Sequence, residues 1–93
     1  MLKFYANKKE ANLIERLIYW CNELSYNIER SPEDTEFTNK CNKEIRYCME
    51  DLQKIGVSRY IIKKCDKIGR DWRKCYNNYL KELLKVENIY ILR

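Results

Sequence analysis

The sequence predicts an all-α protein, an antiparallel up-down-up three-helix bundle with a long third helix and short extended termini. The chain has 93 residues, which is one domain with room for one modest core. It contains only two glycines and one proline, too few for a turn-rich β protein, and 45% of its residues are hydrophobic. Apolar residues recur at three- and four-residue steps in three segments. We therefore expect a single helical domain over residues 1–93.

The first helix is predicted over residues 8–30. Asn7 can cap its first turn, and Glu10 can return a hydrogen bond to the cap in the manner of a capping box. The apolar stripe of this segment has helical spacing, so we expect it to face the core. Its members are Leu13, Leu17, Trp20, Leu24 and Ile28.

The second helix is predicted over residues 32–55. Ser31 can cap it, and Pro32 suits the first helical position, where no backbone N–H is needed. Gly56 can adopt the left-handed conformation that closes a helix, so the second helix should end just before it. The apolar stripe consists of Phe37, Cys41, Ile45, Cys48, Leu52 and Ile55.

The third helix is predicted over residues 59–87, with Ser58 as its cap. A continuous helix of that length would be about 45 Å long and would project beyond its neighbours. The connections between the three segments are very short, which favours the antiparallel bundle. The apolar stripe of the third segment consists of Ile61, Cys65, Ile68, Trp72, Cys75, Tyr79 and Leu83.

Both ends of the chain have the alternation and the β-favouring residues of short strands. These are "LKFY" at residues 2–5 and "NIYILR" at residues 88–93. In an up-down-up bundle the two termini lie at opposite ends, so they could pair with each other only between two chains. We expect each to fold back as a cap on the bundle instead. A homodimer through the termini or through the third helix is left open.

Catalysis is not expected. The chain has no histidine, which removes the usual general base near neutral pH and the commonest metal ligand. No glycine-rich phosphate loop is present, and no two cysteines have C-x-x-C spacing. We therefore predict no catalytic residue, no cofactor and no metal. The cysteines fall on or beside the apolar stripes, and we expect small reduced core residues at Cys21, Cys41, Cys48, Cys65 and Cys75.

The expected location is the cytoplasm. No apolar run approaches the roughly 20 residues that span a bilayer, and the first residues do not resemble a secretory signal. A helix that lies on an anionic membrane is a weaker alternative, because Trp72 and the aliphatic residues belong to the predicted core. The abundance of Lys, Asn, Ile and Tyr is typical of an AT-rich genome.

Positive charge is concentrated in the last part of the chain. Residues 1–53 hold 8 basic and 10 acidic residues, a net charge of −2, whereas residues 54–93 hold 11 and 4, a net charge of +7. A continuous third helix would align its basic residues in a ridge roughly 40 Å long, suited to phosphates or to an acidic protein groove. An ordinary solvated face is the alternative. The ridge consists of Arg59, Lys63, Lys67, Arg70, Lys74, Lys81 and Lys85.

The stretch "IGVSRYIIKKC" at residues 55–65 resembles the turn and recognition helix of a helix-turn-helix motif. Gly56 would lie in the turn, with Val57, Ile62 and Cys65 buried. The resemblance implies that some residues face a DNA major groove, namely Ser58, Arg59, Tyr60, Lys63 and Lys64. It covers about a dozen residues and departs from the motif upstream, where Asp51 and Leu52 do not fit. A simple helix stop followed by a helix start explains the same residues.

Exposed tyrosines suggest a protein interface. Tyr19 and Tyr26 are seven residues apart and fall off the apolar stripe, and Tyr47 and Tyr60 also lie toward the outside of their helices. The alternative is that the rings lean over the core edge with only the hydroxyl in water.

Taken together, these features predict a small non-enzymatic protein that binds another macromolecule. It would act as an accessory protein, adaptor or inhibitor of the kind that phage and mobile-element genes often encode. The expected partner is a protein, for example a nucleic-acid-handling enzyme, and stable membrane insertion is not expected. The alternative is direct DNA or RNA binding through the basic third helix. The predicted binding residues are Arg59, Lys63, Lys67, Arg70, Lys74, Lys81, Tyr19 and Tyr26.

Overall fold

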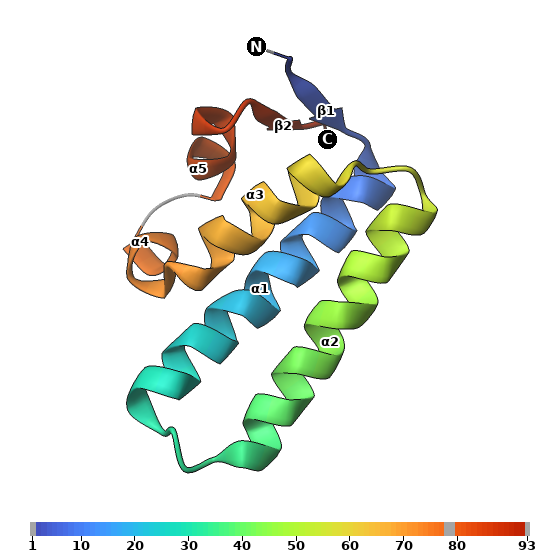
Figure 1. Cartoon of the computed structure of the whole chain (residues 1–93). Helices are drawn as coiled ribbons and strands as arrows, with labels where there is room; N and C mark the ends of the chain where they lie inside the picture. The colour runs from blue at the N-terminus through green and yellow to red at the C-terminus, as the bar shows by residue number, and fades with distance from the viewer. Residues whose placement is uncertain (1, 78–79, 93) are drawn as a thin grey trace.

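A computed structural model describes residues 2–77 and 80–92 of the chain. Most of these residues are helical, and two short strands lie near the ends of the chain (Figure 1). In chain order the elements are β1 (Phe4–Ala6), α1 (Lys8–Arg30), α2 (Thr35–Lys54), α3 (Arg59–Arg70), α4 (Trp72–Asn77), α5 (Leu80–Val86) and β2 (Ile89–Ile91).

Helix α1 is the centre of the bundle. Helices α2 and α3 both pack against it, α2 antiparallel to α1 and α3 in the same direction as α1, whereas α2 and α3 contact each other little (Figure 1). The predicted start of α1 is confirmed: the Asn7 side chain accepts a hydrogen bond from the Glu10 backbone N–H, and the Glu10 side chain accepts one from the Asn7 N–H, both at 2.8 Å. The predicted bundle of the first three helical segments is thus present.

The core is one cluster of aliphatic and cysteine side chains between α1, α2 and α3. In the stripe predicted for α2, four residues are buried and Phe37 and Ile55 pack half-buried against the core. The stripe predicted for α1 is wrong at Ile28, which is 52% exposed, whereas Leu13 and Trp20 pack half-buried against the core. Helix α1 packs against neighbours on two sides, so its buried side is wide and displaced from that stripe. The buried side chains of α1 are Ala11, Ile14, Leu17, Ile18, Cys21, Leu24 and Asn27.

Helix α2 begins at Thr35, three residues after the predicted start. The side chain of Asp34, not that of Ser31, accepts the capping hydrogen bond, from the backbone N–H of Phe37 at 3.1 Å. Ser31 instead ends α1, where its N–H bonds the carbonyl of Asn27. The four residues between α1 and α2 form the connecting turn. Pro32 lies in this connection and not in the first turn of α2.

The predicted long third helix, residues 59–87, is wrong. Helix α3 ends at Arg70, and Asp71 has the non-helical backbone angles φ −88° and ψ 73°. The Asp71 carboxylate then accepts a hydrogen bond from the backbone N–H of Lys74, at 3.4 Å, at the start of α4. After α4 the chain turns back, and α5 packs against α3. Tyr79, a member of the predicted stripe, lies outside the described residues.

Because the chain turns back, the two extended ends meet within one molecule. Strands β1 and β2 pair in parallel, with Tyr5 opposite Tyr90. This corrects the expectation that the ends could pair only between chains or act as separate caps. One face of the sheet packs on the core through Ala6 and Ile89, which are fully buried, and the opposite face carries the two tyrosines.

Candidate functional site

The outer side of α1 carries exposed aromatic rings. Tyr19 is 55% exposed and Tyr26 is 42% exposed, as predicted. The Tyr19 ring meets Trp20 edge to face with centroids 5.1 Å apart, and the Tyr26 ring meets Trp72 edge to face at 4.9 Å. Edge-to-face contact is a favoured geometry of aromatic pairs and holds both rings in place. We call these four residues the aromatic face: Tyr19, Trp20, Tyr26 and Trp72.

Cations flank the rings of the aromatic face. The guanidinium of Arg30 lies 5.7 Å from the centroid of Tyr26, and that of Arg73 lies 4.8 Å from the centroid of Trp72. The Lys40 ammonium lies 5.8 Å from the centroid of Trp20. These distances are within the range of cation–π attraction. Tryptophan, tyrosine and arginine are also the residue types that dominate binding energy in protein interfaces.

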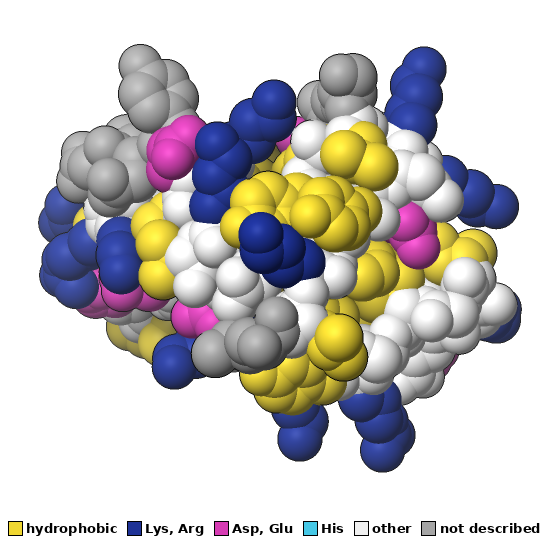
Figure 2. Space-filling view, turned by 90° about the horizontal axis from the view of Figure 1, so that it is seen from above, with side chains coloured by type: hydrophobic (Ala, Val, Ile, Leu, Met, Phe, Trp, Pro, Cys, Tyr) yellow, Lys and Arg dark blue, Asp and Glu magenta, His cyan; other side chains and the backbone are white. Residues whose placement is uncertain are grey.

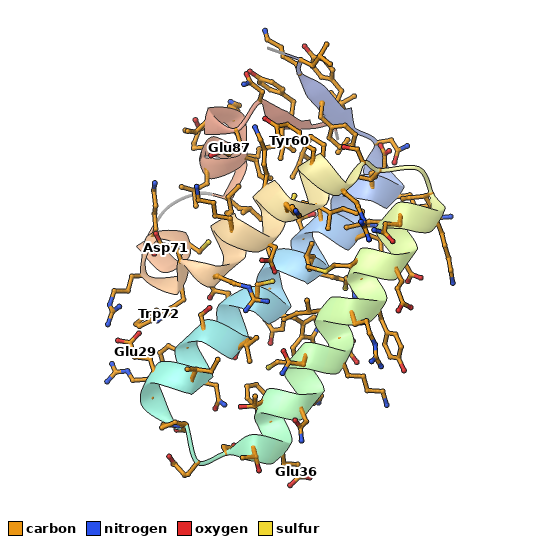
Figure 3. The ribbon with its side chains drawn as sticks, in the orientation of Figure 1. Glu29, Glu36, Tyr60, Asp71, Trp72 and Glu87 are labelled. Atoms are coloured by element: carbon orange, nitrogen blue, oxygen red, sulfur yellow. The ribbon has the colours of Figure 1, made fainter. Side chains whose placement is uncertain are left out.

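Trp72 does not occupy the core, as the sequence had suggested, but lies half-buried where α4 meets the end of α1 (Figure 3). Its indole Nε1–H donates to the Glu29 carboxylate at 2.8 Å, and Arg73 forms an ion pair with the same carboxylate. The indole hydrogen bond, followed by the Arg73 contacts, holds the pKa of Glu29 below its ordinary value. Glu29 therefore stays charged and fixes the orientation of the indole.

Two shallow hollows lie on either side of the Trp72 indole. One, of about 440 Å³, is bounded by Tyr26 and Arg30, and the other, of about 330 Å³, is bounded by Ile28, Arg70 and Arg73. The predicted residues Tyr26 and Arg70 are thus brought to the same surface from α1 and α3. Trp72 lines both hollows, so a partner side chain that fills either hollow would contact the indole.

The continuous basic ridge is not present, because the third helix is broken at Asp71. Arg59, Lys63 and Lys67 remain on one exposed side of α3, at intervals of about 6 Å along the axis. Within the part of the chain that the structure describes, none of these three side chains forms an ion pair. We call these three residues the basic stripe.

The other predicted basic residues are separated from the basic stripe. Arg70 pairs with Asp66 at 3.0 Å. Lys74 belongs to α4, and Lys81 and Lys85 belong to α5. The sequence therefore predicted the exposure of these side chains but not their division among three helices.

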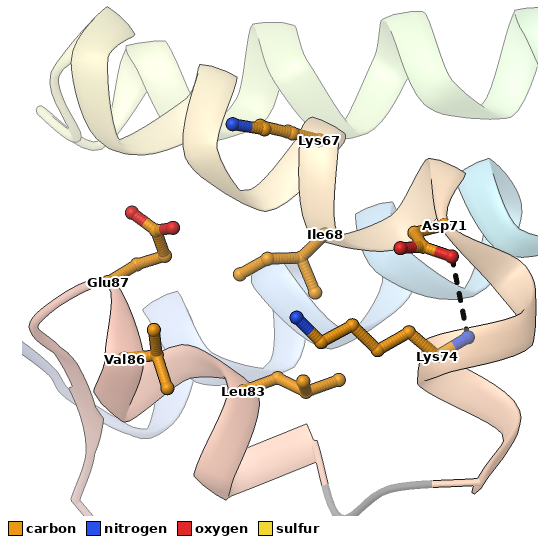
Figure 4. Close-up of a pocket in the computed structure, with 7 residues that line it drawn as sticks. All are labelled: Lys67, Ile68, Asp71, Lys74, Leu83, Val86 and Glu87. Carbon is orange, nitrogen blue, oxygen red and sulfur yellow. Dashed lines mark hydrogen bonds between the residues drawn. The ribbon is translucent and has the colours of Figure 1, made fainter.

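A small cleft of about 170 Å³ lies between α3, α4 and α5 (Figure 4). Lys67 and Lys74 contribute to its wall together with Asp71 and Glu87, and apolar side chains, among them Ile68, fill its base. Two cations and two carboxylates in so small a space give no net preference for an anion. We therefore interpret these residues as a contact that holds α5 against α3 and not as an anion-binding site.

The structure agrees with the helix-turn-helix resemblance in the turn and in the buried residues, but not in the packing of the helices. Gly56 has φ +95°, and Val57, Ile62 and Cys65 are buried, as the motif implies. However, Lys64 is held by Glu87, with its Nζ 3.2 Å from the carboxylate, and α2 and α3 pack on α1 instead of on each other. The local agreement therefore reflects a helix stop and a helix start.

The cysteine thiols are unsuited to nucleophilic attack. Burial raises the pKa of Cys65 to about 12, and burial together with a hydrogen bond to Asp66 raises that of Cys21 well above its ordinary value. The pKa values of Cys41, Cys48 and Cys75 are also raised by burial. Among the described residues, no group of three cysteine or acidic side chains is placed to hold a metal ion, and no helix could cross a membrane.

The sequence did not reveal how Trp72, Glu29 and Arg73 come together, because α4 was not foreseen. The Gly69-Arg70-Asp71 run was the available indication, since a glycine near a helix end followed by a capping aspartate is typical of a restart. A search of models of protein families, of curated proteins and of solved structures found no match to this chain.

Proposed function

We propose that this protein binds a partner protein through the aromatic face and performs no chemistry of its own. The observation that carries the proposal is the Tyr26–Trp72 pair, which is flanked by Arg30 and Arg73 and stands between two hollows. Rings that are already fixed lose little freedom on binding, so more of their contact energy appears as affinity.

The role would be that of an accessory protein, adaptor or inhibitor. Guanidinium groups beside the rings favour a partner that presents carboxylates around an apolar recess. A nucleic-acid-handling enzyme would fit this description through an acidic surface and not through its nucleic-acid groove, because that groove is basic and would repel the guanidinium groups. The raised pKa values of the thiols support a role without nucleophilic chemistry.

The test is affinity capture from the native host with three forms of the protein. The wild type is compared with a Tyr19→Ala/Tyr26→Ala variant and with a Tyr47→Ala variant. Tyr47 is a matched control, because it is 44% exposed and has Lys43 and Arg46 within 6 Å of its ring centroid, but lies on α2. We expect a partner that is captured by the wild type and the control, is lost with the double variant, and binds again when both proteins are purified. A partner lost equally with the control would refute the proposal.

Direct nucleic-acid binding is the second candidate function, and the basic stripe favours it. Arg59, Lys63 and Lys67 are exposed cations on one side of α3 in the part of the chain with net charge +7. Affinity should fall steeply with salt, and neutralising these residues together with Arg70 should abolish binding. The absence of any mobility shift at low salt would remove this candidate.

A further inference from the structure

Two tyrosines lie stacked on the outer face of the two-stranded sheet. The rings of Tyr5 and Tyr90 have centroids 5.3 Å apart and an angle of 25° between their planes. Tyr5 is 54% exposed, although the opposite face of both strands is buried in the core. The parallel pairing places the two residues directly opposite each other, so the ring positions are set by the backbone.

A third tyrosine lies at the same end of the molecule. Tyr60 projects from the first turn of α3 near β2 and is 62% exposed (Figure 3). The ammonium of Lys64 lies 4.6 Å from the Tyr60 centroid and also donates to the carbonyl of Glu87, at 3.3 Å, just before β2. Lys64 thus ties the start of α3 to the sheet. We call these three residues the tyrosine platform: Tyr5, Tyr60 and Tyr90.

Cations surround the tyrosine platform. Lys3 lies over the Tyr90 ring at 5.7 Å, and Arg59 and Lys63 of the basic stripe flank Tyr60 along α3. Figure 2 shows this end of the molecule from above, with hydrophobic side chains gathered at the centre and Lys and Arg side chains over them and around them. Exposed aromatic rings beside cationic side chains are the composition of surfaces that bind single-stranded nucleic acid.

We propose that the tyrosine platform binds single-stranded nucleic acid, with bases stacked on the exposed rings and phosphates on Arg59 and Lys63. The inference rests on the second candidate function, direct nucleic-acid binding through the basic stripe. It adds that the bound nucleic acid is single-stranded and continues from the basic stripe onto the tyrosine platform. A single strand fits better than a duplex, because only unpaired and unstacked bases can lay their faces on an aromatic ring. Cations alone would serve a duplex equally well.

The test uses the full chain, a short fluorescein-labelled oligothymidine and a duplex of the same length, with anisotropy measured at low salt. We expect the wild type to bind the single strand more tightly than the duplex. A Tyr5→Ala/Tyr60→Ala variant should bind the single strand at least about tenfold more weakly, since it removes the rings on which the bases stack. A Tyr5→Phe/Tyr60→Phe variant should keep the affinity, because phenylalanine retains the ring face.

Tyr47→Ala again serves as the control and should leave the affinity unchanged. Equal binding of single strand and duplex, with no effect of the alanine double variant, would overturn this inference and leave nucleic-acid binding by the basic stripe standing. No binding of either probe would remove both. The alanine double variant could instead change the oligomeric state of the protein without changing its affinity for oligothymidine. That result would mean that the tyrosine platform forms contacts between copies of the chain, and it would also overturn the inference.

Discussion

The rings of Tyr26 and Trp72 meet edge to face with their centroids 4.9 Å apart, and this contact joins the end of α1 to the start of α4. The same indole donates a hydrogen bond to Glu29 of α1. One side chain therefore holds α4 in place and forms the centre of the surface proposed to bind a partner. An aromatic pair of this geometry contributes about 0.5–1.5 kcal/mol beyond the burial of its area.

Replacing Trp72 should test how strongly the indole holds α4. We expect Trp72→Ala to lower the free energy of unfolding by about 2 kcal/mol, less than for a fully buried tryptophan because Trp72 is only half-buried. Trp72→Phe keeps a ring against Tyr26 but loses the hydrogen bond to Glu29, so its effect should be smaller. Urea unfolding followed by far-ultraviolet circular dichroism measures both, and equal losses would contradict the role given to the ring pair.

The contribution of Glu29 should depend on pH. Its pKa in the folded protein is lowered, chiefly by the Trp72 hydrogen bond, from an ordinary value of 4.5. A carboxyl with a depressed pKa stabilises the fold above its unfolded pKa, and this contribution is lost as pH falls through the folded pKa. Thermal unfolding of wild type and Glu29→Gln should therefore differ at pH 7 and converge well below pH 4.5. If the difference in thermal stability between the wild type and Glu29→Gln did not change with pH, the charge of Glu29 would not be its cause.

Local chemistry allowed the first half of the fold to be predicted. The Asn7–Glu10 capping box starts α1 where expected, and the spacing of Cys41, Ile45 and Cys48 identified the buried side of α2. Both depend on residues within one or two helical turns. The exposure of Tyr19 and Tyr26 was predicted for the same reason, since it follows from their position outside the apolar stripe.

The second half could not be predicted because apolar spacing continues across a break. Ile68 and Trp72 are four residues apart, as in one helix, yet Asp71 ends α3 between them. The pairing of Tyr5 with Tyr90 depends on this break, because a continuous helix would have carried the C-terminus away from the N-terminus. The Gly69-Arg70-Asp71 run was a local indication of the break, but the direction that the chain takes after it is set by tertiary structure. The tyrosine platform and the position of Trp72 depend on that direction.

The cysteines should differ in reactivity in the folded protein. Burial lowers the thiolate fraction by raising the pKa, to about 12 for Cys65, and four of the five thiols are buried. With a chromogenic disulfide at pH 8 we expect only Cys75, which is half-buried, to react before unfolding, and slowly. All five should react in urea. Rapid reaction of Cys21 in the native state would contradict its burial and its hydrogen bond to Asp66.

The close approach of α1 and α3 depends on Gly69. A Cβ at this position would lie 2.6 Å from the Cβ of Cys21 and 2.9 Å from the carbonyl oxygen of Ile18. Alanine normally stabilises a helix interior by about 1 kcal/mol relative to glycine. Here the atoms in the way are backbone and Cβ, which cannot rotate aside, so the helices must separate, and overpacking of this kind costs about 1–3 kcal/mol. We therefore expect Gly69→Ala to destabilise the protein in urea unfolding, and Cys21→Ala not to rescue it, because alanine keeps the obstructing Cβ.

Lys67→Ala, an exposed change in the same helix, is the control and should change stability by less than about 0.5 kcal/mol. A Gly69→Ala protein more stable than the wild type would mean that α1 and α3 are not held at this distance.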